Sequence, residues 1–141
     1  MRTLAIDYGA RRIGVAVSDA LGITSRGVTT LRRTGDGRAV ADIARLADEL
    51  EAEAVVVGVP LRADGTPGTA AERVLRFVAE LRATVAIPVD TIGEWLTSYE
   101  AEERMRQEGL KARERKERVD QAAAVVILEE YLAAKERRAD G

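Results

Sequence analysis

The sequence predicts an α/β fold in which helices flank a mixed five-stranded sheet. Three observations support this prediction. Two short apolar runs lie on either side of a glycine-containing turn near the start of the chain, as in a β-hairpin. From about residue 36 onward, segments with helical spacing of apolar residues alternate with short apolar runs, as in a parallel sheet with crossover helices. The 141 residues suffice for one core, so we expect residues 1–141 to form a single domain.

The first three strands are predicted to form an antiparallel meander. Residues 3–6 form a short apolar run, and residues 12–18 alternate bulky side chains with small ones, which is the period of a strand. The turn through residues 9–11 joins these two strands into a hairpin. Residues 23–31 are rich in Thr and Val, so we expect them to extend the meander as a third strand.

The pattern then changes to that of a helix followed by a buried strand. Apolar residues recur at helical spacing over residues 40–50, and Asp36 is the expected N-cap of this helix. Residues 54–59 are apolar throughout except for a glycine, which is typical of a buried strand. A loop over residues 60–68 follows this fourth strand.

A second helix and a fifth strand are predicted after the loop. Thr69 and Glu72 fit a capping box, and an apolar stripe continues from there to Leu81. The fifth strand is predicted over residues 85–92. A third helix is then expected from a capping box at Thr97 to about Gly109. The first three strands are thus antiparallel, and the last two run parallel.

The last part of the chain is predicted to hold one more helix. Residues 111–118 are too charged to be buried, and we expect a flexible basic segment over about residues 109–117. From about Glu117 to Ala134, apolar side chains share one helical stripe. The predicted order of elements is therefore β-β-β-α-β-α-β-α-α.

The chain contains no His and no Cys. This excludes Ser-His-Asp and Cys-His nucleophilic catalysis, zinc sites built from His or Cys, and disulfide bonds. Any chemistry must therefore come from carboxylates, hydroxyls, amides, Lys or Arg.

Charge is unevenly distributed, although the formal net charge is only −2. Residues 1–38 and residues 104–118 each carry seven basic residues against three acidic ones, whereas residues 39–103 are strongly acidic. The two basic zones suit contact with a phosphate backbone, and they suit solvated faces with helical ion pairs equally well. No apolar run approaches the ~20 residues of a membrane span, so we expect a cytoplasmic protein without membrane contact.

Three carboxylates stand out from those on polar helix faces. Asp7 ends a strand that should lie at the centre of the sheet, and Glu94 follows the fifth strand at the same edge. Asp120 occupies the first position of the last apolar stripe, where a carboxylate is costly unless it is paired or binds a metal. Each also has a simpler interpretation: Asp7 begins a turn, Glu94 faces solvent, and Asp120 caps a helix or pairs with a nearby arginine, Arg115 or Arg118. Together, however, the three predict a site for Mg²⁺ or Mn²⁺.

The residues also resemble the motif series of the RuvX/YqgF family, in order along nearly the whole chain. The matching segments are Ala5-Ile6-Asp7-Tyr8-Gly9, residues 12–19, residues 57–61 with Asp64-Gly65, residues 94–98 with Ala101, and residues 120–123 with Ile127-Leu128. The resemblance implies an RNase H-like fold related to RuvC. It also implies a nuclease that either resolves Holliday junctions or processes the 5′ end of pre-16S ribosomal RNA. The family's metal-binding acids match Asp7, Glu94 and Asp120.

One motif departs from the family pattern. The family usually has Asp and Arg on either side of the middle acid, whereas this chain has Gly93 and Trp95 around Glu94. This leaves the phosphate contact of the absent Arg in doubt. Trp95 either stacks on an exposed base, which is worth ~1–3 kcal/mol, or fills the edge of the core.

The mechanism expected from the resemblance is two-metal phosphodiester hydrolysis. Asp7 would bridge two cations roughly 3.5–4 Å apart, with Glu94 and Asp120 each completing one side. The expected partner is a nucleic acid, either structured RNA or branched DNA, with pre-16S ribosomal RNA favoured and the protein a monomer or a homodimer. The residues expected to contact nucleic acid are Arg11, Arg12, Arg62, Trp95, Lys111, Arg113 and Arg115.

Two other classes of function compete with the nuclease. Phosphotransferases of the actin-like and sugar-kinase type share the core sheet and an Asp-x-Gly near the first strand, as in Asp7-Tyr8-Gly9. They need two such domains to enclose ATP, and this chain has the length of one and lacks a GxxxxGK[ST] loop. A non-catalytic nucleic-acid-binding module is the other class, and the altered positions Gly93 and Trp95 are its main support.

Overall fold

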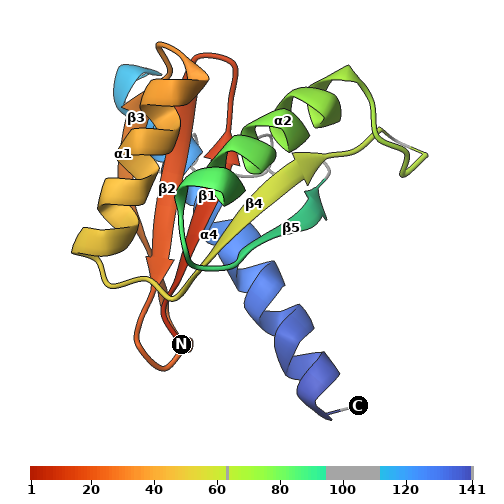
Figure 1. The fold of residues 1–141 in the computed structure, drawn as a ribbon. Coiled ribbons are helices and arrows are strands. Elements are labelled where there is room, and N and C mark those ends of the chain that lie inside the picture. The colour runs from red at the N-terminus through yellow and green to blue at the C-terminus, as the bar shows by residue number, and fades with distance from the viewer. Residues whose placement is uncertain (63, 95–111, 141) are drawn as a thin grey trace.

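A computed structural model describes residues 1–62, 64–94 and 112–140 and confirms the predicted five-stranded sheet (Figure 1). The strand order is β3-β2-β1-β4-β5. The first three strands pair antiparallel, and β1–β4 and β4–β5 pair parallel, as predicted. β1 therefore lies at the centre of the sheet. The strands are β1 (Thr3–Tyr8), β2 (Arg12–Ser18), β3 (Ser25–Arg32), β4 (Ala54–Pro60) and β5 (Val89–Glu94).

Helices cover both faces of the sheet (Figure 1). α1 (Asp36–Glu49) and α2 (Thr69–Thr84) pack on one face, over the large apolar side chains of the strands. α4 (Ala112–Asp140) packs on the other face, over a smaller core. The alternation of strand side chains divides the two cores. The strand residues under α1 and α2 are Leu4, Ile6, Ile13, Val15, Val17, Val55, Val57 and Val59, and those under α4 are Ala5, Ala16 and Val56.

Glycines on the α4 face allow the helix to lie very close to the sheet. A Cβ at Gly14 of β2 would lie 1.9 Å from the carbonyl oxygen of Asp120. A Cβ at Gly58 of β4 would lie 2.5 Å from Cδ1 of Ile127. A larger residue at Gly14 would displace the backbone of α4, whereas one at Gly58 would displace the Ile127 side chain, so Gly14 sets the depth at which Asp120 lies.

The third strand begins at Ser25, two residues later than predicted. The side chain of Asp19 accounts for the difference, because it takes the preceding residues out of the ladder. Its carboxylate accepts a hydrogen bond from the backbone N–H of Ile23 at 2.8 Å and another from the hydroxyl of Thr24 at 3.0 Å. Residues 19–24 therefore form a turn that competes with strand pairing.

The predicted caps of the first two helices are wrong. The N-caps are Gly35 and Gly68, and neither helix start has a side-chain cap. Asp36 lies inside the first turn of α1, where its carboxylate accepts a hydrogen bond from the Tyr8 hydroxyl at 2.5 Å. Thr69 is the first residue of α2. Capping patterns compete with such tertiary contacts, which sequence spacing does not reveal.

The fifth strand begins at Val89 rather than at residue 85. The N–H of Val85 donates to the carbonyl of Leu81 at 3.0 Å and so closes α2, and Pro88 has no N–H to give to a ladder. The last helix begins at Ala112, not at residue 117, and extends to Asp140. Ala, Arg, Lys and Glu are strong helix formers, which explains the earlier start.

Two further predictions concern the regions around these elements. The third predicted helix, over residues 97–109, lies outside the described residues. No helix in the described part of the chain is long and apolar enough to cross a membrane.

Candidate functional site

Asp7 lies near the carboxyl end of the central strand, on the face that α4 covers. It pairs across the sheet with Gly14 of β2. On its other side, Gly58 lies one residue beyond the Ile6–Val57 pair of β1 and β4. A strand position with a glycine on each side leaves room above the sheet for the carboxylate. The structure confirms the predicted position of Asp7, which lies on the central strand and near the carboxyl end of that strand.

Asp120 is brought to this position by the close approach of α4. Its backbone lies directly over Gly14, the cross-strand partner of Asp7. Its side chain is 15% exposed, and its Oδ2 accepts a hydrogen bond from Nε of Arg12 at 2.6 Å in an ion pair. The sequence suggested a nearby helical arginine as the partner of Asp120, whereas the partner in the structure comes from β2.

The sequence predicted that Glu94 follows the fifth strand. In the structure Glu94 instead belongs to this strand, as the last residue of β5. In the parallel ladder it lies opposite Pro60 of β4. It alternates in phase with Ile92, which packs in the core under α4, so Glu94 lies on the same face of the sheet as Asp7. It is 8% exposed, and a Cβ at Gly58 would lie 3.4 Å from its Cγ. Gly58 thus separates the positions of Asp7 and Glu94.

Burial and neighbouring charge favour the protonated form of Asp7 in the absence of a cation. Burial, and in second place the negative charge of Asp120, raise the pKa of Asp7 from 3.8 to about 7. Burial also raises the pKa of Asp120, and the hydrogen bond and charge of Arg12 oppose this shift. Two acids therefore interact at the Gly14 position, and one of them pairs with an arginine.

The donor chemistry of the site fits a hard divalent cation. The only side-chain donors that the predicted site offers are carboxylates, which suit Mg²⁺ and Mn²⁺. A cation between Asp7 and Asp120 would offset the repulsion that raises the pKa of Asp7. Among the described residues, however, no three acidic side chains lie close enough together to hold one metal ion. Arg12 holds Asp120 in this arrangement.

The residues predicted to contact nucleic acid fall into three groups. Arg11 is exposed in the turn after β1, and Arg62 is exposed in the loop after β4. Arg12 is partly exposed and pairs with Asp120. Trp95 and Lys111 lie outside the described residues. Arg113 and Arg115 belong to α4, but their side chains lie outside the described part.

Sequence reasoning missed two arginines beside the site, Arg32 and Arg33. They stand at the end of β3, next to the turn that holds Arg11 and Arg12, and the four arginines line one cavity. The adjacent pair at positions 32 and 33 was a visible signal in the sequence. Its meaning depends on the pairing of β2 with β3, which brings the two pairs of arginines together.

Comparisons with known proteins agree with this fold. The family model RuvX, described as Holliday junction resolvase, matches residues 1–134. A protein of Anaeromyxobacter dehalogenans (strain 2CP-C) is 44% identical over 132 residues, covering 94% of this chain and 96% of that protein. One of Syntrophus aciditrophicus (strain SB) is 45% identical over 134 residues, covering 95% and 89%. Both carry the name "Putative pre-16S rRNA nuclease".

Two solved resolvases share the fold. RuvC of T. thermophilus in complex with a Holliday junction aligns with a TM-score of 0.62 at 19% identity, covering 96% of each chain. The Fowlpox virus resolvase with junction DNA aligns with a TM-score of 0.56 at 11% identity, covering 95% of this chain and 98% of that one. The expected RNase H-like fold is confirmed. The match of the family model over residues 1–134, with relatives 44–45% identical over nearly the whole chain, places this chain in the RuvX family.

Proposed function

We propose that this chain is a metal-dependent nuclease that hydrolyses a phosphodiester bond of pre-16S ribosomal RNA, with Asp7, Glu94 and Asp120 as the metal ligands. The observation that carries the proposal is the burial of Asp7 on the face of the sheet where α4 places Asp120. Burial, and in second place the charge of Asp120, raise the pKa of Asp7 to about 7. Carboxylates kept in such surroundings are typical of functional sites. The names of relatives 44–45% identical to this chain support the choice of RNA.

The residues of the site divide the work of hydrolysis. The three carboxylates would hold the cations at the carboxyl edge of β1 and β5, with Asp7 in its ionised form. When bound, a pair of Mg²⁺ or Mn²⁺ ions lowers the pKa of the attacking water and stabilises the leaving 3′ oxygen. Arg12 fixes Asp120 through Nε, and its guanidinium carries four further N–H donors for a phosphate oxygen. Water adds to phosphorus, and the bond from phosphorus to the leaving oxygen breaks.

The test is a cleavage assay with wild-type protein and the Asp7→Asn variant. The substrates are an end-labelled transcript with the 5′ leader of 16S RNA and a labelled four-way DNA junction, each with Mg²⁺, Mn²⁺ or Ca²⁺. We expect the wild type to cut the transcript in Mg²⁺ or Mn²⁺, and Asp7→Asn to lose at least 100-fold in rate, as for other preorganised catalytic groups. Equal rates for the two proteins would contradict the proposed role of Asp7.

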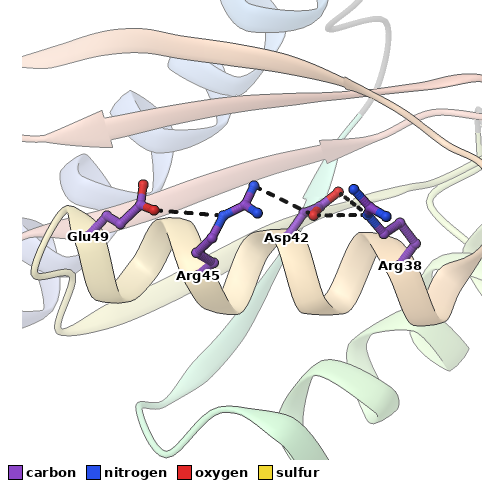
Figure 2. Close-up of polar contacts among 4 residues, drawn as sticks. All are labelled: Arg38, Asp42, Arg45 and Glu49. Atoms are coloured by element: carbon purple, nitrogen blue, oxygen red, sulfur yellow. Dashed lines mark hydrogen bonds and ion pairs between the residues drawn. The ribbon is translucent and has the colours of Figure 1, made fainter.

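The matched control is Asp42→Asn in α1. The Asp42 side chain is 15% exposed, like that of Asp120, but it lies on α1, on the opposite side of the sheet from α4, where it pairs with Arg38 and Arg45 (Figure 2). We expect Asp42→Asn to cleave at the wild-type rate. A loss as large as that of Asp7→Asn would show that general destabilisation, and not chemistry, causes the effect.

A Holliday junction resolvase is the second candidate, and the description of the matching family model favours it. Symmetric cleavage of a junction calls for a two-fold dimer, whereas processing of an RNA end does not. Cleavage of the junction but not of the transcript would replace the proposed substrate and leave the proposed site unchanged. Binding of both substrates by the wild type, without cleavage in any metal, would instead support a non-catalytic binding module.

A further inference from the structure

A cavity of about 370 Å³ opens at the carboxyl edge of β1, where the turn into β2 meets the end of β3. Four of its described lining residues are arginines and none is acidic. We call it the arginine cavity. Its lining residues are Ala10, Arg11, Arg12, Arg32 and Arg33.

Backbone pairing holds the arginines together. Arg12 of β2 lies directly opposite Arg32 of β3 in the antiparallel ladder. One step further, the N–H of Arg33 donates to the carbonyl oxygen of Arg11 at 2.9 Å. Like charges at opposite positions of two strands destabilise a sheet. The fold therefore maintains a concentration of positive charge at this point, which carboxylates of the protein offset only at Arg12 and Arg33.

Two of the four arginines are fixed by partners within the protein. Arg12 pairs with Asp120. Nε of Arg33 donates to the Tyr8 hydroxyl at 3.0 Å and lies 3.6 Å from Asp36, and Nη1 donates to the carbonyl of Ala10 at 3.1 Å. These contacts fix the guanidiniums of Arg12 and Arg33 in the lining of the cavity.

The other two arginines keep their charge available. Arg11 and Arg32 are exposed, and neither forms an ion pair with any residue that the structure describes. Guanidinium groups bind phosphate oxygens with paired N–H donors, and their charge persists at any physiological pH. Two fixed and two available guanidiniums around one cavity thus match a phosphate group.

We propose that the arginine cavity binds a phosphodiester group of the bound nucleic-acid strand, close to the phosphodiester that is cleaved at Asp7. This inference rests on the proposed function. Strand alternation places Arg12 and Arg32 on the face of the sheet that carries Asp7. Neighbouring strands lie about 4.8 Å apart, so β3 lies about 10 Å from β1, within reach of one bound strand. The contact positions the backbone and does not select a sequence.

The test measures binding in EDTA, where cleavage does not occur. A fluorescent single-stranded RNA is titrated with wild type, Arg11→Gln, Arg32→Gln and the double variant at 50–200 mM salt. The control is Arg38→Gln/Arg45→Gln, which removes two arginine charges that pair with acids of α1 and do not line the cavity (Figure 2). Thermal melting establishes that every variant is folded.

Log K falls as log salt rises, and we expect each lost phosphate contact to make this negative slope shallower by ~0.7 for a single strand. The ratio of wild-type to variant affinity then grows about 2.6-fold from 200 to 50 mM salt for each contact. The control should keep the wild-type slope. An unchanged slope in the folded double variant, or an equal change in the control, would overturn the proposal.

A second arm distinguishes a nucleic-acid phosphate from a free one. Inorganic phosphate is titrated into wild type and into the Arg11→Gln/Arg32→Gln variant by calorimetry. Weak phosphate binding that the variant loses, together with a reduced RNA slope, supports the proposal. Phosphate binding with an unchanged RNA slope would assign the cavity to free phosphate and overturn it. Because none of these measurements requires cleavage, a failure here is distinct from a failure of the cleavage assay.

Discussion

Replacement of Asp7 by asparagine should change how the stability of the protein depends on pH. The folded protein keeps a proton on Asp7 up to about pH 7, because burial and Asp120 raise its pKa. The unfolded chain releases that proton near the ordinary value of 3.8. The unfolded state therefore binds fewer protons between these values, and the wild type loses stability as pH rises through them. Asparagine has nearly the same shape but does not titrate.

The size of the effect follows from the difference between the two pKa values. One unit corresponds to about 1.4 kcal/mol, so the ionised Asp7 costs the folded state about 4 kcal/mol at pH 8. At pH 5 more than half of this cost is absent, and about 1.7 kcal/mol remains. The free energy of unfolding should therefore fall by about 2.5 kcal/mol more in the wild type than in Asp7→Asn between pH 5 and pH 8. A constant cost of burying the amide does not affect this difference.

Urea unfolding in EDTA, followed by circular dichroism at several values of pH, measures the effect. Asp19→Asn is the control, because hydrogen bonds lower the pKa of this exposed carboxyl and keep it ionised throughout the range. It should shift the whole curve without changing its shape above pH 5. Curves for the wild type and Asp7→Asn that run parallel from pH 5 to pH 8 would refute the reasoning. Excess Mn²⁺ should stabilise the wild type at pH 8 more than Asp7→Asn, because a cation binds the ionised carboxylates.

Three further predictions concern the packing and charges around the site. Arg12→Gln leaves Asp120 without its counter-charge and should cost about 1–2 kcal/mol at pH 8, less than for a fully buried pair because Arg12 is 37% exposed; unchanged urea stability would contradict this. Gly14→Ala should lower the free energy of unfolding by about 3 kcal/mol, because the new methyl group meets the α4 backbone. Gly37→Ala, with open space around it, should raise the free energy of unfolding by up to about 1 kcal/mol. Similar urea midpoints for the two variants would refute the packing explanation. Arg32→Gln removes a like-charge pair across β2 and β3 and should raise stability by up to about 0.5 kcal/mol; a lower melting temperature would count against that repulsion.

Much of the fold could be predicted from the spacing of apolar residues, because this spacing shows which side chains are buried. The alternation in residues 12–18 and the apolar run of residues 54–59 predict β2 and β4 closely, since both strands are buried. The ends of elements were harder to predict because they depend on local competition. The carboxylate of Asp19 takes Ile23 and Thr24 out of the sheet, and Asp36 binds Tyr8 in place of capping α1.

The site shows the same division between local and distant effects. Asp7 could be placed at the centre of the sheet from the order of strands alone, and Asp120 could be placed on a buried stripe from its spacing. The pairing of Asp120 with Arg12 could not be predicted, because the two residues are 108 positions apart. It depends on Gly14, whose missing side chain lets α4 descend onto β2.

Two unfavourable charge arrangements lie at this edge of the sheet, one of negative groups and one of positive groups. On β1, burial and the charge of Asp120 on α4 disfavour the ionised form of Asp7. On β2 and β3, Arg12 and Arg32 repel each other across the ladder. A divalent cation would relieve the first cost and a phosphate the second, and a metal-bound phosphodiester offers both charges side by side. Arg12 contacts Asp120 and lines the arginine cavity, so it joins the two halves. The free protein thus carries an electrostatic strain that its proposed substrate, with its metal, would release.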